Sequence, residues 1–372
     1  MSDAVLPYHA GGKETRHHEV VRRLATSGFD VEIHTMRWWP ERGDAYHGGI
    51  RYRPLTALWP MYRDGRRCLV QAVMFAIGGF RMLFRRFDVV EVDSVPVVQI
   101  FVLRLATWLR RRRLVVTWHE VWGAESWRSY LGPIGSIAAV LERWALTLPD
   151  HIVSPSPGTA RRIDEMTGGR TPVTVVPNGI DLPAINAVQP AAQRHDLVFV
   201  GRLIEHKNVS ALLRGLAVLS ARGDRITCRI IGTGPQQESL RRQAVELGLD
   251  GLVRFDGWVR SDEDVLAALK AARVFVSLSE REGFGISVLE ALACGLPVVA
   301  YDHPDNHARH LLVDGVTARL VDTLEPAAVA AAIDWTLRHA DRLRGPAADS
   351  ALSYDWDTIA REMEKVYGAC ES

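Results

Sequence analysis

The chain has 372 residues, of which 47% are hydrophobic and 24% charged, and its formal net charge is +1. This composition excludes a disordered or repetitive protein and is sufficient for two globular domains, each with its own core. The four cysteines show no Cys-x-x-Cys spacing, so neither a disulfide framework nor a zinc site is indicated. The first residues lack the basic and apolar segments of a signal peptide, so we expect a cytoplasmic protein.

Short apolar segments alternate with helical segments along the whole chain, a pattern typical of parallel α/β layers. In the first half we expect strands at residues 4–7, 30–35, 89–92, 114–117, 151–154 and 173–176. In the second half we expect strands at residues 197–200, 227–231, 253–255, 274–278 and 297–301. Each half therefore carries enough strands for a Rossmann-like domain of its own.

A stretch rich in Pro, Ala and Gln separates the two sets of strands, and this composition is typical of a linker. The sequence therefore predicts an N-terminal domain of residues 1–182, a linker of residues 183–196 and a C-terminal domain of residues 197–355.

The most informative turn follows the strand at residues 274–278. Gly283 and Gly285 expose the backbone of this turn, and a helix over residues 286–293 begins directly after it. Backbone N–H groups at the start of a helix lack partners and carry partial positive charge, so such a turn binds anions or hydroxyl groups well. Glu290 lies on this otherwise apolar helix, where a carboxylate is costly unless a group bonds to it.

A second turn of the same kind follows the strand at residues 197–200. It contains Gly201, Arg202 and Lys207, and the chain has only four lysines among its 45 basic residues. A guanidinium group binds paired phosphate oxygens, and an ammonium group acts as a point charge. Either turn alone reads equally well as a solvated loop. Together, at the carboxyl ends of two strands of one domain, they predict a diphosphate site flanked by carboxylates.

These two turns resemble the donor site of retaining glycosyltransferases of family 4. The Gly-Arg pair is followed by a Lys five residues after the Arg, and Glu-Gly-Phe-Gly is followed by a Glu eight residues after its first Glu. The same resemblance extends to residues 11–12, 115–119, 176–181, 232–235 and 295–300. It implies the GT-B fold, in which two Rossmann-like parallel-sheet domains face a central cleft. It also implies that the C-terminal helix, residues 356–372, joins the first domain.

The resemblance assigns roles to individual residues. Arg202 and Lys207 would bind the diphosphate, Glu282 and His119 the hydroxyls of the transferred sugar, and Glu290 those of the ribose. Further donor contacts are implied for Gly11, Gly12, Gly201, Gly234, Val259, Gly283, Phe284, Gly285 and Ile286.

The segment that follows His119 lies on the expected acceptor side. Its candidate acceptor residues are Glu120, Trp122 and Trp127. Aromatic faces suit the apolar faces of sugars, although tryptophans are also common in protein cores.

Residues 302–307 depart from the family pattern, which often has a Gly-Gly pair and a Glu at this place. This difference leaves the donor chemistry intact and bears on the identity of the transferred sugar.

Asp262, Glu263 and Asp264 have the Asp-x-Asp spacing with which other glycosyltransferases hold a metal ion. Because they follow Ser261 and precede an apolar helical run, a capped helix start explains them without a metal. We therefore expect no metal site and no cofactor, with a nucleoside diphosphate sugar as the donor substrate.

Charge is distributed unevenly along the chain. Residues 1–170 carry 24 basic and 17 acidic side chains, a net charge of +7, whereas the remainder has a net charge of −6. Arginines surround the apolar segment at residues 68–80, which is too short to cross a bilayer. Two interpretations stay open, a peripheral contact with anionic lipid or helices packed on the sheet with their arginines in water. No nucleic-acid-binding module is recognised.

The sequence thus predicts a metal-independent, retaining glycosyltransferase that uses a UDP or GDP sugar and a hydroxyl acceptor, which is lipid-linked, a glycan or a small molecule. A GT-B nucleotide-sugar epimerase or hydrolase and a catalytically silent sugar-nucleotide-binding protein are the alternatives. A nicotinamide-dependent oxidoreductase is not supported, because no strand leads into Gly-x-Gly-x-x-Gly.

Overall fold

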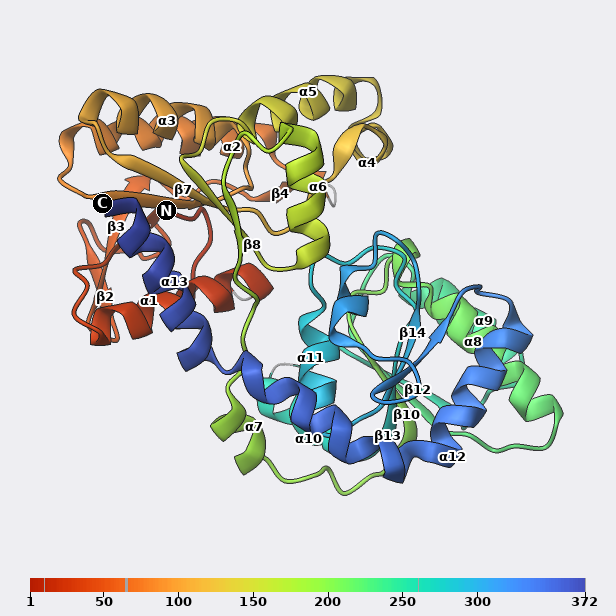
Figure 1. The fold of residues 1–372 in the computed structure, drawn as a ribbon. Helices are drawn as coiled ribbons and strands as arrows, with labels where there is room; N and C mark the ends of the chain where they lie inside the picture. Colours follow the sequence, from red (N-terminus) through yellow and green to blue (C-terminus); the bar gives the residue numbers. More distant parts are fainter. Residues whose placement is uncertain (10, 64–65, 260, 372) are drawn as a thin grey trace. The chain divides into compact units, whose positions relative to one another are not determined.

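The computed structural model describes residues 1–9, 11–63, 66–259 and 261–371. The chain forms two compact units (Figure 1). Unit 1 comprises Met1–Asn178 and Trp356–Ser372, and unit 2 comprises Gly179–Asp355. Each unit is built on a parallel sheet covered by helices, as the resemblance implies.

Unit 2 contains a six-stranded parallel sheet with the order β12-β11-β10-β13-β14-β15. Its strands are β10 (His195–Val200), β11 (Cys228–Ile231), β12 (Val253–Gly257), β13 (Ala272–Ser277), β14 (Val298–Tyr301) and β15 (Ala318–Val321). Its longer helices are α8 (Val209–Ala221), α9 (Gln237–Glu246), α10 (Asp262–Lys270), α11 (Ile286–Ala293) and α12 (Pro326–Ala351).

The central strand β13 shows why this sheet forms. Val274, Phe275 and Val276 are all buried, so the strand is apolar on both faces, as parallel strands between two helical layers are. Because side chains alternate along a strand, Val274 and Val276 pack with α8 and α12, whereas Phe275 packs with α10 and α11 on the opposite face.

The strand order of unit 2 reverses between β10 and β13. From β10 the chain proceeds outward through β11 to β12, then returns to β13 and proceeds through β14 to β15 on the other side. The loops that follow β10 and β13 therefore leave the sheet in opposite directions. Ligands of open α/β sheets bind at such a point, outside the carboxyl ends of the strands.

Unit 1 contains a four-stranded parallel sheet with the order β6-β7-β8-β9 and a three-stranded sheet with the order β1-β3-β2. Its strands are β1 (Glu32–Met36), β2 (Ala45–His47), β3 (Ile50–Thr56), β4 (Tyr62–Arg63), β5 (Arg66–Arg67), β6 (Val89–Asp93), β7 (Arg113–Thr117), β8 (His151–Ser154) and β9 (Val173–Val175). Its helices are α1 (Gly12–Thr26), α2 (Leu69–Gly78), η1 (Gly79–Phe84), α3 (Val98–Arg110), α4 (Gly123–Leu131), η2 (Gly132–Ile134), α5 (Gly135–Ala145), α6 (Pro157–Thr167) and α13 (Trp356–Glu371).

The C-terminal helix α13 lies beside α1 in unit 1 (Figure 1). Trp356, Ile359 and Met363 of α13 share a buried cluster with Val20 and Leu24 of α1. The helix therefore belongs to the core of unit 1 although it follows unit 2 in the sequence.

The strand expected at residues 4–7 does not form, and this prediction was wrong. The amides of Tyr8 and His9 both donate to the carbonyl of Val5, so the chain turns there instead of extending. Ahead of the turn, Ser2 N donates to the carbonyl of His34 in β1 at 3.1 Å. Met1 N donates to the carbonyl of Glu91 in β6. The first residues thus touch both sheets without forming a ladder with either.

The segment at residues 183–196, interpreted from its composition as a linker, packs on unit 2. It contains most of the short helix α7 (Leu182–Ala187), whose Ile185 is buried. Asp181 caps this helix through the amide of Ala184 at 2.8 Å. Lys270 of α10 then donates to the carbonyl of Val188 at 2.7 Å. Specific contacts therefore hold the segment, and the contact boundary falls at Asn178.

Candidate active site

The loop after β10 is positioned by two glycines of the loop after β11. A Cβ atom on Gly232 would lie 1.9 Å from the carbonyl oxygen of Gly201, and one on Gly234 would lie 2.3 Å from that of Leu203. Only glycine permits so close an approach of two backbones. The amide of Leu203 donates to the carbonyl of Thr233 at 2.9 Å and fixes the register. Gly234, predicted as a donor contact, has this structural role.

Arg202 lies in this fixed loop, directly beyond the end of β10. Its side chain is exposed, and it forms no ion pair with any residue that the structure describes. A guanidinium group placed so at the switch point is available to an anionic ligand.

Lys207 ends the short helix η3 (Glu205–Lys207), which links the loops after β10 and β13. The amide of Glu280 donates to the carbonyl of His206 at 2.8 Å, and the Asn208 side chain donates to that of Leu278 at 3.0 Å. The Lys207 ammonium forms an ion pair with the carboxylate of Glu282, and both side chains are largely buried. Two predicted site residues, from turns 75 positions apart, are thus in contact.

The environment of His206 reports the charge of this region. Burial, together with the positive charges of Arg281, Lys207 and Arg202, lowers the pKa of His206 from 6.5 to about 4. The nearby Glu282 carboxylate opposes this shift, so burial is its largest cause and the three cations add to it. A concentrated positive field of this kind suits an anion with more than one charge.

Glu282 is held by the segment that departs from the family pattern. Its amide donates to the carbonyl of Asp305 at 3.1 Å, and the amide of His307 donates to the carbonyl of Glu282 at 2.9 Å. Asn306, fully buried between them, donates from its side chain to the carbonyl of Tyr301 at 2.8 Å. The unusual sequence at residues 302–307 therefore positions the backbone of a predicted sugar-binding residue.

Helix α11 starts at the carboxyl end of β13. Gly285 precedes it with φ +91, and a Cβ atom there would lie 2.5 Å from the Cβ atom of Ala308. Glycine is thus required both by the backbone and by the space. The first N–H groups of α11, from Ile286 onward, begin beside the half-buried Gly283.

Glu290 follows one turn into α11. Burial, with a smaller effect of the charge on Asp262, raises the pKa of Glu290 from 4.5 to about 7. Within the described ranges its carboxylate has no hydrogen-bond or ion-pair partner. A carboxyl group kept close to neutral in this way is available to a ligand that donates hydrogen bonds.

Two predicted donor contacts are also core residues. Phe284 is buried, and its ring lies 6.1 Å from that of Tyr354. Val259 is partly buried against the same cluster. The buried Phe284 side chain stabilises unit 2 and leaves its backbone for a ligand, whereas part of the Val259 side chain stays exposed. Arg260, next to Val259, lies outside the described residues.

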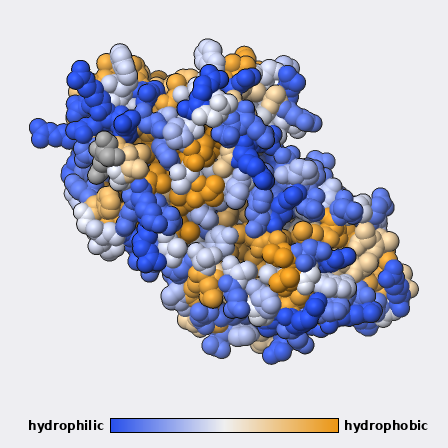
Figure 2. Space-filling model, viewed as in Figure 1, coloured by the Kyte–Doolittle hydropathy of each residue, from blue (hydrophilic) through white to orange (hydrophobic). Residues whose placement is uncertain are grey.

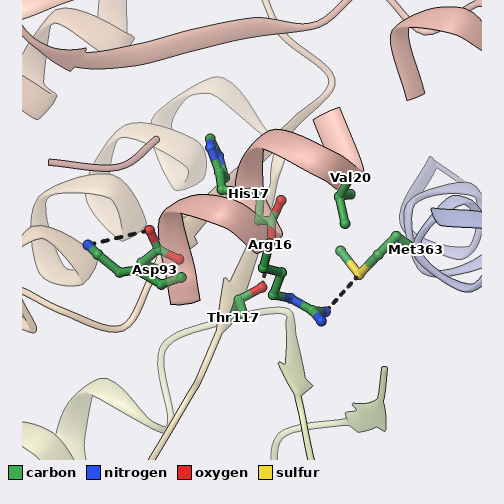
Figure 3. Close-up of a pocket in the computed structure, with 8 residues that line it drawn as sticks. Arg16, His17, Val20, Asp93, Thr117 and Met363 are labelled. Atoms are coloured by element: carbon green, nitrogen blue, oxygen red, sulfur yellow. Dashed lines mark hydrogen bonds and ion pairs between the residues drawn. The ribbon is translucent and has the colours of Figure 1, made fainter. Parts of the chain in front are cut away.

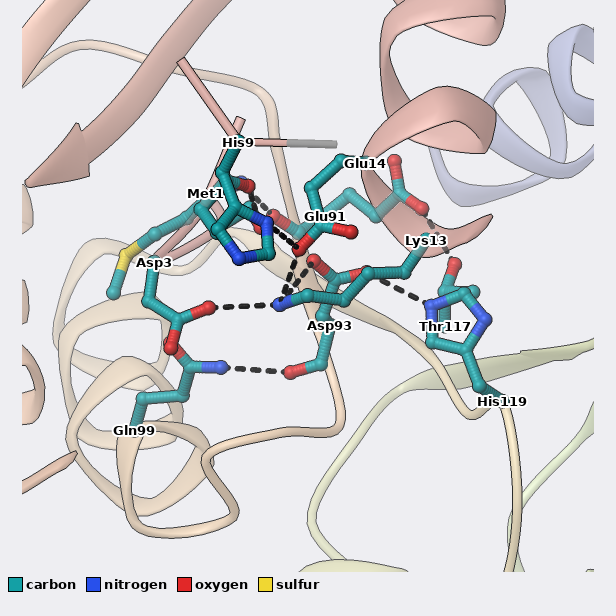
Figure 4. A network of polar contacts seen from close by, with 12 residues as sticks. Met1, Asp3, His9, Lys13, Glu14, Glu91, Asp93, Gln99, Thr117 and His119 are labelled. Atoms are coloured by element: carbon teal, nitrogen blue, oxygen red, sulfur yellow. Dashed lines mark hydrogen bonds and ion pairs between the residues drawn. The ribbon is translucent and has the colours of Figure 1, made fainter. Parts of the chain in front are cut away.

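In unit 1, His119 lies just beyond the end of β7, as predicted. Its Nε2 atom is 3.0 Å from Oδ1 of Asp93, which ends the neighbouring strand β6 (Figure 4). The Gln99 side chain donates to the carbonyl of Asp93 at 2.8 Å. Asp93 therefore fixes the orientation of His119. The sequence analysis missed Asp93, although its place after an apolar strand was a usable signal.

Asp93 belongs to a buried polar cluster, which we call the N-terminal cluster: Asp3, Lys13, Arg67, Gln71, Asp93 and His119. Lys13 Nζ lies 2.7 Å from Asp3 and 3.8 Å from Asp93 (Figure 4). Arg67 also pairs with Asp3, which accepts a hydrogen bond from Gln71 at 3.1 Å. Burial alone would raise the pKa of Asp3, but the charges of Lys13 and Arg67 outweigh it and lower the pKa.

Gly11 and Gly12, implied as donor contacts, form the start of α1. A Cβ atom on Gly11 would lie 2.5 Å from Oε2 of Glu14, so the buried Glu14 carboxyl covers the helix start. One turn later, the buried Arg16 reaches from α1 to Sδ of Met363 in α13 at 3.6 Å (Figure 3). It also donates to Asn178 at 3.2 Å, which gives residues 176–178 a structural role.

The tryptophans on the expected acceptor side contact other aromatic rings. The centroids of Trp122 and Trp127 are 4.8 Å apart, and Trp122 meets Tyr130 edge-on at 5.2 Å. Glu142 accepts from the amide of Trp122 at 3.0 Å. These contacts account for the aromatic residues as a cluster around α4. The acceptor role of Glu120, Trp122 and Trp127 stays a prediction.

The Asp-x-Asp segment starts helix α10. Ser261 Oγ accepts from the amide of Asp264 at 3.4 Å, which confirms the predicted cap. Across the part of the chain that the structure describes, no three His, Cys, Asp or Glu side chains are grouped to hold a metal ion.

The predicted residues thus fall into two sets. Unit 2 brings together Arg202, Lys207, Glu282, Gly283, Gly285 and Glu290 around the ends of β10 and β13, and unit 1 carries Gly11, Gly12 and His119.

Solved structures of known proteins share this architecture. Sucrose-phosphate synthase from Thermosynechococcus elongatus superimposes with a TM-score of 0.78 at 20% identity, covering 97% of this chain and 94% of that one. Anabaena Alr3699/HepE, solved in complex with UDP-glucose, gives a TM-score of 0.72 at 18% identity over 97% of each chain. The fold is therefore GT-B.

Sequence comparison names the family. Residues 10–183 match Glycosyltransferase Family 4, and residues 184–346 match Glycosyl transferases group 1. D-inositol 3-phosphate glycosyltransferase of Thermobispora bispora is 29% identical over 96% of this chain and 90% of its own. Phosphatidyl-myo-inositol mannosyltransferase of Mycobacterium leprae is 33% identical over 52% of each chain. The chain belongs to glycosyltransferase family 4 and is an enzyme of the transferase class.

Proposed function

We propose that this enzyme transfers a hexose-like sugar from a nucleoside diphosphate sugar to a hydroxyl acceptor with retention of the anomeric configuration. The observation that carries this proposal is the position of Arg202 and Lys207 in the turn after β10, with Lys207 in contact with Glu282 of the turn after β13, at the switch point of unit 2. A leaving nucleoside diphosphate is the anion that such a pair of cations stabilises.

Arg202 and Lys207 bind the diphosphate, and the first N–H groups of α11 add the positive end of a helix dipole. Without donor, Lys207 is neutralised by Glu282. When the donor binds, Lys207 exchanges this partner for a phosphate oxygen and the Glu282 carboxylate becomes free to accept from a sugar hydroxyl. The pair thus serves as a preformed part of the site.

Glu290 accepts hydrogen bonds from the ribose hydroxyls. These bonds to the carboxylate offset the cost of ionising it in a buried position, where its pKa is about 7. The donor is a UDP sugar or a GDP sugar. The structure of Alr3699/HepE with UDP-glucose supports testing UDP sugars first.

His119 binds a hydroxyl of the transferred sugar. Its hydrogen bond to Asp93 fixes the direction of the ring, so Asp93 is a positioning residue. Catalysis rests on orientation and on stabilisation of the leaving charge. We assign no covalent nucleophile, and the leaving phosphate assists deprotonation of the acceptor.

Product analysis tests this function. The enzyme is incubated with UDP or GDP hexoses and a panel of acceptors that includes inositol 3-phosphate and phosphatidylinositol, chosen from the names of its relatives. An α-linked donor should give an α-linked product, as read from the anomeric proton coupling. An inverted linkage would contradict the mechanism. Epimerisation or hydrolysis of the donor with no transfer to any acceptor would contradict the proposed reaction.

A further inference from the structure

Unit 1 exposes an unusual number of large apolar side chains on its helices. Phe84 at the end of η1 is 86% exposed, Trp108 of α3 65% and Trp144 of α5 62%. Scattered exposed apolar residues are normal, but a contiguous group marks an interaction surface. The arrangement of these residues on their helices shows whether they are scattered or form a contiguous surface.

Helix α2 is apolar on two sides. Phe75 and Ala76 are buried in the core of unit 1. On the other side, an exposed stripe has the spacing i, i+4, i+8, with Leu69, Val73 and Ile77. A helix at the surface of a globular protein normally has a polar outer face. This helix lacks one, so its outer face is suited to another apolar phase.

Helices α3 and α5 show the same outward pattern. Leu105, Trp108 and Leu109 share one side of α3, with the spacing i, i+3, i+4. Ile137 and Trp144 share one side of α5, separated by two helical turns. Meanwhile Leu103 and Ala106 of α3 are buried against the sheet.

These helices form one layer. Helix α3 packs against α2, against η1 and against α5. Hydrophobic residues are visible along the upper edge of unit 1 in Figure 2, where α3 and α5 run in Figure 1. We call this surface the apolar face; its members are Leu69, Val70, Val73, Ile77, Phe80, Phe84, Leu105, Trp108, Leu109, Ile134, Ile137, Val140 and Trp144.

Arginines lie at the end of the apolar face where η1 and α3 terminate. Arg110 donates to the carbonyl of Leu83 at 3.2 Å, which brings the two ends together. Arg85, Arg86 and Arg111 are exposed beside them, and within the described residues none of the three pairs with a carboxylate. An apolar surface bordered by uncompensated positive charge is complementary to one partner in particular, an interface of acyl chains below anionic headgroups.

We propose that the apolar face of unit 1 docks on an anionic lipid bilayer, with its apolar side chains among the acyl chains and its arginines on the headgroups. The contact is peripheral, since none of the described helices is long and apolar enough to span a bilayer. A second copy of the chain fits less well. In a two-fold dimer the same patch meets itself, so the two basic ends add uncompensated charge to the contact. The proposal does not depend on the identity of donor or acceptor.

Vesicle cosedimentation of the full chain, without nucleotide, tests the proposal. Phosphatidylcholine vesicles with and without phosphatidylglycerol are compared at low and high salt. We expect binding to the anionic vesicles at low salt, at least tenfold weaker binding to the neutral ones, and loss at high salt. Equal binding to both vesicle types, or no binding to either, overturns the proposal.

Two variants and one control separate the contributions. The double variant Arg85→Gln/Arg86→Gln should lower partitioning roughly 25-fold, or about fivefold per arginine. Phe84→Ser/Trp108→Ser should lower it at least tenfold at unchanged charge. The control Arg222→Gln/Arg225→Gln removes two exposed arginines of unit 2 and should bind as the wild type does. An equal loss in the control would reduce the effect to net charge and contradict the assigned face.

Size-exclusion chromatography with light scattering tests whether a second copy of the chain binds to the apolar face instead. The protein should have the same mass with and without Phe84→Ser/Trp108→Ser. A lipid-free dimer that this variant converts to monomers would assign the face to a second copy and overturn the proposal. Because both side chains are mostly exposed, the variant should keep the wild-type melting temperature.

Discussion

The two units hold their charges in opposite ways. In the N-terminal cluster of unit 1, Asp3 is fully buried and is bonded to Lys13, Arg67 and Gln71. At the switch point of unit 2, Arg202 is exposed without a partner among the described residues, and Glu290 is held near neutrality by its surroundings. The charge of Asp3 is paired within the protein, whereas Arg202 and Glu290 have no partner in the part of the chain that the structure describes.

This difference distinguishes structural charge from functional charge. A buried network with every member bonded fixes one arrangement of the chain, and loss of one member exposes the others to the full cost of burial. Groups at the carboxyl edge of a sheet whose partners are missing are the ones that a ligand completes. Substitution of Asp3 should therefore affect folding, and substitution of Arg202 or Glu290 should affect binding.

The largest effect should come from the N-terminal cluster. Asp3→Asn removes the charge that pairs with Lys13 and Arg67 and should lower the free energy of unfolding by roughly 3 to 5 kcal/mol, measured by chemical denaturation. Asp334→Asn is the control, because its pair with Arg338 is exposed, and it should stay within about 0.5 kcal/mol. A change below about 1 kcal/mol in Asp3→Asn would mean that the cluster does not stabilise unit 1.

Substitutions at the switch point should act on turnover. Arg202→Ala and Lys207→Ala each remove charge-assisted bonds worth roughly 1.5 to 3 kcal/mol, so kcat/KM at low donor should fall by about one to two decades. The melting temperature of Arg202→Ala should stay close to that of the wild type, whereas Lys207→Ala leaves the largely buried Glu282 unpaired and should melt at a lower temperature. Arg225→Ala removes an exposed arginine of the same unit and serves as the control. Wild-type turnover in Arg202→Ala would disprove its assignment to the diphosphate.

Glu290 should make donor binding depend on pH. Its pKa of about 7 means that the carboxyl is mostly protonated near pH 6, and only the carboxylate accepts two hydroxyl bonds. The Kd for the donor should therefore rise by about tenfold from about pH 8 to about pH 6. Glu290→Gln should bind more weakly than the wild type at high pH and remove this pH dependence. An unchanged pH profile in the variant would assign the titration to another group.

Stability should respond to the same group with the opposite sign. Because the folded pKa of Glu290 is about 7 and the ordinary value is 4.5, the native state binds more protons between these two values. The free energy of unfolding attributable to Glu290 thus falls as pH rises through this window. Glu290→Leu should be as stable as the wild type or more stable at neutral pH. A large loss of stability there would make Glu290 a structural residue.

The smallest effect is expected at the start of α10. Ser261→Ala removes the side-chain bond to the amide of Asp264 and should cost about 1 kcal/mol of stability. Activity should persist in the variant and after thorough chelation, since we assign the acids to the helix start. Loss of activity with EDTA and rescue by Mn²⁺ or Mg²⁺ would contradict that assignment.

Much of the fold could be predicted from apolar runs, because parallel strands buried on both faces are short and almost entirely apolar. Two elements have the limits that we expected from the sequence, the strand at residues 151–154 and the helix at residues 286–293. Strands β2 and β3 were missed, since Arg51, Arg53 and Pro54 interrupt the apolar pattern of β3. The error at residues 4–7 has another cause. A turn whose carbonyl accepts two amides replaced the expected ladder, and propensity does not show this competition.

The proximity of Lys207 to Glu282 could be predicted because they lie in two short turns, each beside a strand end, and the binding role of these turns stays a prediction. The N-terminal cluster could not be predicted, since Asp3, Lys13 and Asp93 are distant in sequence and each is an ordinary residue type. The contact between residues 302–307 and Glu282 could not be predicted either, because it consists of backbone hydrogen bonds, which do not depend on the type of side chain.

The most direct test of the switch-point assignment is the Kd for UDP and GDP, measured by calorimetric titration. The wild type is compared with Arg202→Ala/Lys207→Ala, with chelator present. We expect one site in the wild type and a Kd raised by at least tenfold in the double variant, at a temperature where both proteins are folded. Equal affinity in the two proteins would contradict the assignment of these cations to the leaving diphosphate.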